Sequence, residues 1–210
     1  MYVPPRFNDA TLAHAPALMR QHPFASLVSN DDDGMPVVTH LPLHLDDAKD
    51  PWRLLGHCAR ANPHWRFLQQ RPQALATFLG PHAYLSPTVY PDLARVPTWN
   101  YLAVHCQVEA KVLDEPQDKD ELLKHLIGDH EPAYAEQWRG LDESYTQKML
   151  GGIVAFELRV TQVQCQLKLN QHRPEAHDAT VAVYARGDDN QRALADWMEK
   201  LKPAGKSGLE

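Results

Sequence analysis

Charged and hydrogen-bonding side chains gather in one short segment, between His57 and His64. His57 and Arg60 come after an expected strand, and Asn62-Pro63 is typical of a helix start, with Asn as the N-cap and Pro at the first helical position. Backbone amides at a helix N-terminus favour a bound anion, and a guanidinium grips a phosphate through two parallel hydrogen bonds. The segment therefore indicates a phosphate site built on Arg60 and His57, with a plain helix cap beside a surface charge as the alternative.

Side chains suited to a flat aromatic ligand occur in three other segments. Thr39 lies in a strand expected over 35–45, where two prolines favour an edge position that leaves backbone groups open to a planar ring. An ordinary edge strand is the alternative there. Trp99 and Asn100 open a long strand, where they can pack on a ligand or on a second copy of the chain, and the loop segment 80–87 adds His and Tyr. We expect one polar, aromatic-lined site.

The segment Lys168–Pro174 ends the last long strand with several hydrogen-bonding side chains. It is either a plain surface turn or a basic rim that closes over an anionic ligand. The 12 histidines include no close set such as His-Glu-x-x-His, so no metal site is expected. Glycine-rich nucleotide motifs, a Ser-His-Asp order and paired carboxylates are also missing, which leaves the catalytic residues unassigned.

Composition indicates an ordinary globular protein. With 43% hydrophobic residues among 210, the chain can bury a core in one domain, which we expect over 1–201, followed by a flexible tail over 202–210. The 21 basic against 27 acidic residues give a net charge of -6, which does not favour DNA binding. Neither a signal-peptide core nor a membrane-length apolar run is visible, so a cytoplasmic location without membrane contact is expected. The cysteines are interpreted as reduced core thiols.

Hydrophobic periodicity predicts an α+β fold with an antiparallel barrel rather than a doubly wound sheet. A first helix is expected after an N-cap at Asn8 or Asp9 and ends at Pro23, and a final one runs over 188–201. Helices should also follow Asn62-Pro63 and fill an insert over 116–150. The six expected strands are 24–29, 35–45, 52–57, 74–79, 98–113 and 153–169.

Several of these segments, in this order, resemble the motifs of the PaiB family, which is described as FMN-binding negative transcriptional regulators. The matching segments are Phe24–Ser29, Thr39–Leu43, Gly56–Pro63, Gly80–Pro87, Val96–Tyr101 and Lys168–Pro174. The resemblance runs from Met1 to about Leu201. The chain departs from the family's pattern at Asn170 and His172, where Ser and Asn are usual.

The resemblance implies a six-stranded FMN-binding split barrel with peripheral helices, similar to pyridoxamine phosphate oxidase, and a homodimer with flavin at the subunit interface. It also assigns positions around the flavin. Thr39, His40 and Leu41 would lie along the isoalloxazine ring; His57, Arg60 and Ala61 would hold the phosphate; Trp99 and Asn100 would come from the strand at the dimer interface; Lys168, Gln171 and Arg173 would close the site.

For function, the resemblance implies a negative transcriptional regulator. The acidic balance and the lack of a helix-turn-helix pattern oppose direct operator contact, so the effect can be indirect, with FMN reporting redox state. An FMN-dependent oxidoreductase acting on a small molecule is the alternative. A haem-binding split barrel with a His axial ligand is a further one.

Overall fold

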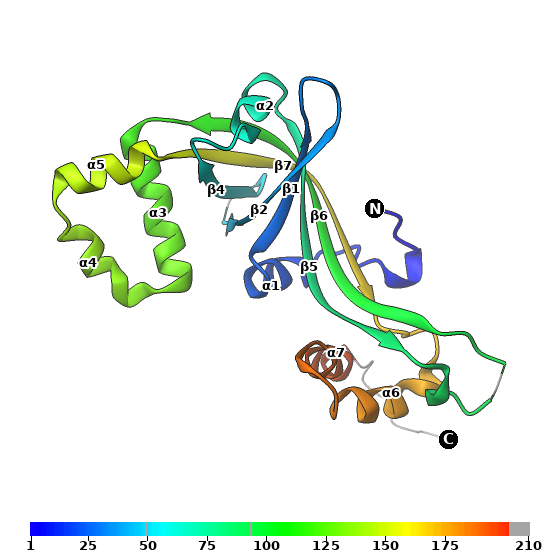
Figure 1. Ribbon diagram of the computed structural model, residues 1–210. Helices are drawn as coiled ribbons and strands as arrows, with labels where there is room; N and C mark the ends of the chain where they lie inside the picture. The colour runs from blue at the N-terminus through cyan, green and yellow to red at the C-terminus, as the bar shows by residue number, and fades with distance from the viewer. Residues whose placement is uncertain (49, 93, 202–210) are drawn as a thin grey trace. The chain divides into compact units, whose positions relative to one another are not determined.

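The computed structural model describes residues 1–48, 50–92 and 94–201 (Figure 1). Its contacts form two compact units. Unit 1 comprises Met1–Thr11, Leu79–Ala103 and the described residues from Cys165, and unit 2 comprises Leu12–Phe78 and Val104–Gln164. One domain over 1–201 stays a prediction, and the expected tail over 202–210 lies outside the described residues.

The described strands form one seven-stranded sheet in the order β2-β1-β5-β6-β7-β4-β3. β1 pairs antiparallel with β2 and β5, and β4 pairs antiparallel with β3 and β7. Their bounds are β1 Phe24–Asn30, β2 Pro36–Pro42, β3 His44–Asp46, β4 Arg53–Ala59, β5 Gln73–Leu85, β6 Thr98–Leu113 and β7 Ile153–Lys168. The predicted α+β class with an antiparallel barrel is confirmed.

The sheet has seven strands rather than the predicted six because the segment 35–45 divides at Leu43. Pro42 has no N–H to donate, and the Leu43 N–H bonds to the Pro23 carbonyl at 3.0 Å instead of to a neighbouring strand. Before this point the chain pairs with β1, and after it with β4. The break is therefore a corner at which one segment changes partner.

In unit 2, β2 and the corner after it approach β4 closely at Gly56. A Cβ atom added at Gly56 would lie 2.5 Å from Leu43 Cδ2 and 2.9 Å from Leu41 Cδ1. Leu41 lies in β2, the first strand in the sheet order, and Leu43 follows it. Such contacts are shorter than van der Waals distance, so only glycine admits the side chains of β2 and its corner this close. This close approach is where the two ends of the sheet meet.

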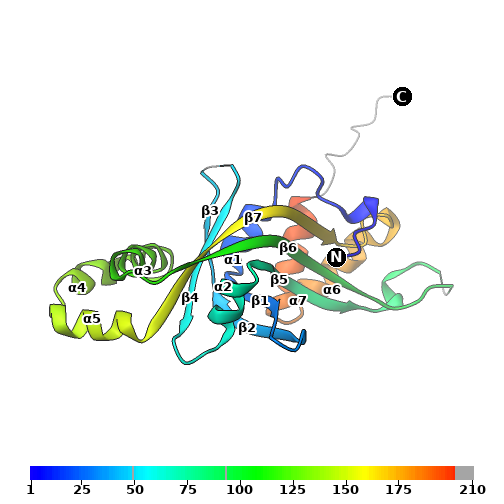
Figure 2. The same ribbon diagram turned by 90° about the horizontal axis from the view of Figure 1, so that it is seen from above.

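Unit 2 also contains helices, of which α3, α4 and α5 form a group at the end of β6 and the start of β7 (Figures 1 and 2). They are α1 Ala15–Gln21, α2 His64–Gln70, α3 Pro116–His130, α4 Ala135–Arg139 and α5 Glu143–Gly151. The last three occupy the range expected to be helical. α3 buries Leu122 and Leu126 against Ala155 of β7, because these leucines recur at helical spacing on one face.

The predicted start of the first helix is wrong. A 3-10 turn over Pro5–Phe7 comes first, Leu12 has a φ of 56°, and the helix begins only at Ala15. A left-handed residue cannot continue a right-handed helix. Asp9 instead donates its N–H to the Cys165 carbonyl at 3.0 Å.

Unit 1 contains α6 His177–Tyr184 and α7 Asp189–Lys200, which pack side by side (Figures 1 and 2). α7 matches its expected range and begins with a capping box between Asp188 and Gln191. α6 was not predicted, and β5 runs to Leu85 instead of ending at Leu79. Within the described ranges, no helix has the length and hydropathy of a membrane span.

Candidate functional site

Arg60 follows β4 and its guanidinium is held by backbone. Nε donates to the Gly151 carbonyl at 2.8 Å, and Nη2 to the Ile153 carbonyl at 3.2 Å. Both terminal nitrogens of the guanidinium also face the Asp114 carboxylate. Nη2 lies 2.5 Å from Oδ1, and Nη1 lies 3.3 Å from Oδ2. A guanidinium fixed in this way presents a two-point grip suited to a carboxylate or a phosphate.

Asp114 is shared by a second cation. Lys119 Nζ lies 2.6 Å from Asp114 Oδ1, although the Lys119 side chain is only 4% exposed. The hydrogen bonds from Arg60 and Lys119 lower the pKa of Asp114, while Asp114 in turn raises the pKa of Arg60. The sequence reasoning missed both residues, since Asp114 lies 54 positions from Arg60 and no local pattern pairs them.

His57 lies on β4 opposite Ala155 of β7. Its Nδ1 atom is buried and, among the described residues, finds no hydrogen-bond partner. Burial lowers the pKa of His57, so the imidazole favours its neutral form. A buried ring nitrogen without a partner is an open hydrogen-bonding position of the kind that ligand sites retain.

Thr39 is part of a buried hydrogen-bond network rather than a free surface hydroxyl. Its Oγ1 lies 2.7 Å from His64 Nδ1 and accepts from Asn62 Nδ2 at 3.1 Å. The other ring nitrogen of His64, Nε2, lies 2.8 Å from Ser29 Oγ. The Asn62 carboxamide also accepts the His64 N–H at 3.0 Å. α2 nevertheless begins at His64 with Pro63 as its N-cap, so the predicted cap at Asn62 is one residue too early.

The other assigned residues of unit 2 have different environments. His40 is exposed, lies 2.9 Å from Ser26 Oγ and stacks on Phe24. Leu41 points into the core and is 4% exposed, whereas Ala61 is exposed. β2 is the first strand in the sheet order, so one edge of its backbone pairs with no other strand among the described residues. Any contact of Leu41 with a ligand would therefore have to come from its backbone.

In unit 1, Trp99 lies in an exposed aromatic cluster. Its ring centroid lies 5.8 Å from that of His82 and 6.4 Å from that of Tyr84. Trp99 on β6 is 52% exposed, and Tyr84 on β5 is 49% exposed. Leu79, also on β5, is 57% exposed. Apolar side chains this open on neighbouring strands typically mark a contact surface.

Asn100, the next residue, is fully buried at 0% exposure. Its Nδ2 donates to the Tyr184 hydroxyl at 3.3 Å, and that hydroxyl donates to the Tyr84 carbonyl at 3.2 Å. Burial raises the pKa of Tyr184 to about 12, so the hydroxyl keeps its proton. Neighbouring residues of a strand point to opposite faces, which separates Asn100 from the exposed Trp99 ring.

Lys168 and Gln171 are engaged within unit 1. Lys168 Nζ donates to Thr98 Oγ1 at 2.7 Å, and burial lowers the pKa of this ammonium group. The Gln171 carboxamide donates to the Leu167 and Arg6 carbonyls and accepts the Leu169 N–H, which braces the turn after β7. This turn supports its own backbone through its side chains.

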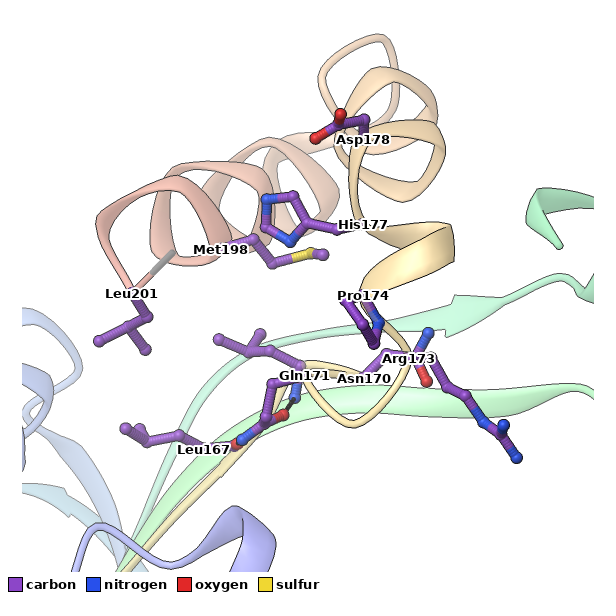
Figure 3. Close-up of a pocket in the computed structure, with 10 residues that line it drawn as sticks. Leu167, Asn170, Gln171, Arg173, Pro174, His177, Asp178, Met198 and Leu201 are labelled. Atoms are coloured by element: carbon purple, nitrogen blue, oxygen red, sulfur yellow. Dashed lines mark hydrogen bonds between the residues drawn. The ribbon is translucent and has the colours of Figure 1, made fainter. Parts of the chain in front are cut away.

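The same turn borders a cavity of about 620 Å³ beside α6 and α7 (Figure 3). Figure 3 shows the Met198 side chain beside His177, while the Arg173 guanidinium extends away from α7. Asn170 adopts a φ of 60° and accepts a hydrogen bond from the Tyr90 hydroxyl at 3.1 Å. Asn is among the residues that tolerate this left-handed conformation, which gives a local reason for its presence here. The lining residues are Leu167, Leu169, Asn170, Gln171, Arg173, Pro174, His177, Asp178, Met198 and Leu201.

The assigned site residues thus divide between the two units. Unit 2 contains Thr39, His40, Leu41, His57, Arg60 and Ala61, and unit 1 contains Trp99, Asn100, Lys168, Gln171 and Arg173. Their joint role around one ligand stays a prediction. Over the described parts of the chain, no three His, Cys, Asp or Glu residues are placed to hold a metal ion. All three cysteines are buried, as expected.

Residues 1–162 match the protein family described as "Putative FMN-binding domain". The chain is 33% identical over 210 residues to a Bacillus subtilis (strain 168) protein, Protease synthase and sporulation protein PAI 2, with 96% of this chain and 99% of that protein covered. A match of this extent shows that the chain belongs to this FMN-binding family.

Two solved structures share the fold. One is a conserved hypothetical protein, Rv2991, from Mycobacterium tuberculosis, with a TM-score of 0.60, 10% identity, and 83% of this chain and 94% of that chain covered. The other is an FAD and Heme binding protein from Mycobacterium smegmatis, with a TM-score of 0.59, 17% identity, and 77% and 73% covered. At these identities the likeness concerns the fold alone. Family match, relative and fold together identify the chain as a member of the PaiB family of FMN-binding split-barrel proteins, with FMN as its cofactor.

Proposed function

We propose that this FMN-binding chain works as a homodimer in which the flavin reports redox state, and that any effect on transcription passes through another molecule. The observation that carries the proposal is the Arg60 guanidinium, which two backbone carbonyls hold so that its fork is turned to an anion. This geometry supports the proposal, because a guanidinium held in place can bind a phosphate group through two hydrogen bonds.

The residues present fit a phosphate monoester. Arg60 supplies charged donors, and the buried Nδ1 of His57 has no partner among the described residues, so it can complete the coordination. His57, Arg60 and Ala61 would hold the phosphate, and the free edge of β2 at Thr39, His40 and Leu41 would lie along the ring. Lys168, Gln171 and Arg173 would close the site. When bound, FMN supplies one- or two-electron transfer that these side chains do not provide.

A second copy of the chain is the partner we propose for the exposed aromatic cluster of unit 1. Tyr84 and Trp99, whose rings are in contact, are each about half exposed, which is unusual for large side chains on neighbouring strands. Trp99→Glu should therefore convert a dimer into a monomer in sedimentation velocity. Tyr2→Glu, at a side chain that is 86% exposed outside the cluster, is the control and should leave the dimer intact. A monomeric wild-type chain would overturn the dimer.

The charge of the chain supports regulation without direct operator contact. The net charge of -6 opposes the phosphate backbone of DNA, whose binding is driven by basic surfaces. Electrophoretic shift assays with promoter fragments should therefore show no saturable binding at moderate salt. Saturable, sequence-dependent binding would show that the protein contacts DNA itself.

The flavin proposal is tested by absorption spectra before and after addition of FMN, and separately of haemin. Arg60→Ala should weaken FMN binding by about 10- to 100-fold, since charge-assisted hydrogen bonds to the phosphate are lost. Arg66→Ala removes an exposed guanidinium that lies over the Trp65 ring and serves as the matched control. Equal FMN affinity of wild type and Arg60→Ala would reject the phosphate assignment. A haem band, or turnover of reduced nicotinamide by the FMN-loaded protein, would favour the alternative functions.

A further inference from the structure

Asp114 lies in the short connection between β6 and α3, where it meets two cations at once. Arg60 approaches with both Nη atoms, and Lys119 approaches Oδ1 at 2.6 Å. The carboxylate thus receives donors from a guanidinium fork and an ammonium group. This is the donor arrangement that proteins commonly offer to a phosphate.

The charges at this point do not balance. Arg60 and Lys119 bring two positive charges and Asp114 brings one negative charge, so the cluster keeps a net positive charge. Lys119 is 3% exposed, and a lysine this deeply buried is rare unless an anion accompanies it. A phosphate monoester carries up to two negative charges and three terminal oxygens, and would satisfy both cations more fully than one carboxylate.

A purely structural role explains the cluster less well. Arg60 is already fastened by the Gly151 and Ile153 carbonyls, so it does not need Asp114 to hold its position. The Asp114 side chain is 50% exposed, so water can solvate it once another anion takes its place beside Lys119. The Asp114 carboxylate can therefore be displaced, whereas the charged groups of Arg60 and Lys119 stay in place.

We propose that Asp114 is an internal competitor for the phosphate of FMN, and that Lys119 joins Arg60 as a second phosphate-binding cation once Asp114 is displaced. The inference rests on the proposed placement of the phosphate at Arg60. Asp114 lowers the affinity for FMN, because the FMN phosphate must replace the Asp114 carboxylate at the same hydrogen-bond donors. This competition favours a doubly charged phosphate over singly charged anions.

The test compares wild type with Asp114→Asn and with Glu115→Gln, which removes the same charge from the adjacent exposed residue. FMN affinity is measured by fluorescence quenching, riboflavin serves as the same ring without phosphate, and inorganic phosphate is scored by its effect on the thermal midpoint. Asp114→Asn should bind FMN about tenfold more tightly, with riboflavin affinity unchanged. It should also gain more thermal protection from inorganic phosphate than Glu115→Gln does.

The outcomes separate this inference from the proposed function. If the wild type binds FMN and Asp114→Asn shows neither tighter FMN binding nor greater protection by phosphate, Asp114 is only a structural brace and the inference fails. If no variant binds FMN but phosphate protects Asp114→Asn selectively, the anion competition stands and the flavin placement fails. Lys119→Gln should weaken FMN binding without affecting riboflavin; equal losses for both ligands would mean that Lys119 acts only through folding.

Discussion

Replacing His64 with Gln is expected to remove part of the acid sensitivity of folding. His64 is 1% exposed, and its two ring nitrogens lie 2.8 Å from Ser29 Oγ and 2.7 Å from Thr39 Oγ1. Burial lowers the pKa of His64 below its ordinary value of 6.5. The folded protein therefore holds this imidazole neutral at a pH where the unfolded chain already binds a proton.

The sign of the effect follows from this difference. Above the unfolded pKa of 6.5, neither state is protonated and the contribution of His64 to stability is fully present. As the pH falls below that value, protonation favours the unfolded chain and the free energy of unfolding decreases, until the folded pKa is reached. One such group changes the free energy of unfolding by at most about 1.4 kcal/mol per pH unit.

The assay is urea unfolding of wild type and His64→Gln at about pH 8 and about pH 5.5, where the difference between the two pH values is compared rather than the absolute stability. The variant loses packing at both pH values, but its stability should fall less on acidification, by up to about 1.4 kcal/mol. His22, His57, His105 and His172 also have lowered pKa values and keep part of the slope in both proteins. An identical slope in the two proteins would refute the reasoning. If the variant does not fold, Ser29→Ala, which removes one partner, is measured in the same way.

Three further predictions concern packing and burial. Gly56→Val should destabilise by about 1–3 kcal/mol in denaturant unfolding, because its side chain meets Leu43; an unchanged midpoint would contradict the close approach of these strands. Cys165, with a pKa raised to about 12, should react with a thiol reagent only as fast as the protein unfolds, and rapid labelling of the native protein would disprove its burial. Tyr184→Phe leaves Asn100 Nδ2 without the hydroxyl to which it donates, and should lower the free energy of unfolding by about 1–3 kcal/mol in thermal unfolding. An unchanged thermal midpoint would contradict this, because it would mean that another group accepts the hydrogen bond.

Strands and strongly periodic helices could be predicted from the sequence because their signals are local. β6 and β7 alternate over long stretches, and α7 carries both an apolar face and a capping box. α6 carries no such signal: its sequence is rich in Ala and Val, and its buried Thr180 and Tyr184 acquire their role through packing. Propensity alone could not identify it.

The errors at the first helix and at Leu43 have one cause in common. In each case a backbone N–H bonds to a distant or non-ladder carbonyl, that of Cys165 for Asp9 and that of Pro23 for Leu43. Tertiary hydrogen bonds of this kind override local preference, and the flanking residues do not show which carbonyl will accept them.

The candidate site shows the same division. The chemistry of Arg60 as an anion-binding residue could be predicted from its type and its place after a strand. Its actual partners, Asp114 and the carbonyls of Gly151 and Ile153, come from segments far along the chain and become visible only in three dimensions. Family resemblance supplied roles, but not the carboxylate that already occupies the fork.

The segmented make-up of unit 1 has a consequence for synthesis on the ribosome. Residues near the N-terminus bond to residues made much later: Asp9 to the Cys165 carbonyl, and the Arg6 carbonyl to Gln171. At about 5–20 residues per second, these early residues wait on the order of ten seconds for their partners to emerge. During that interval they are accessible to chaperones and proteases, so the speed of translation sets how long this part of the chain stays without its partners.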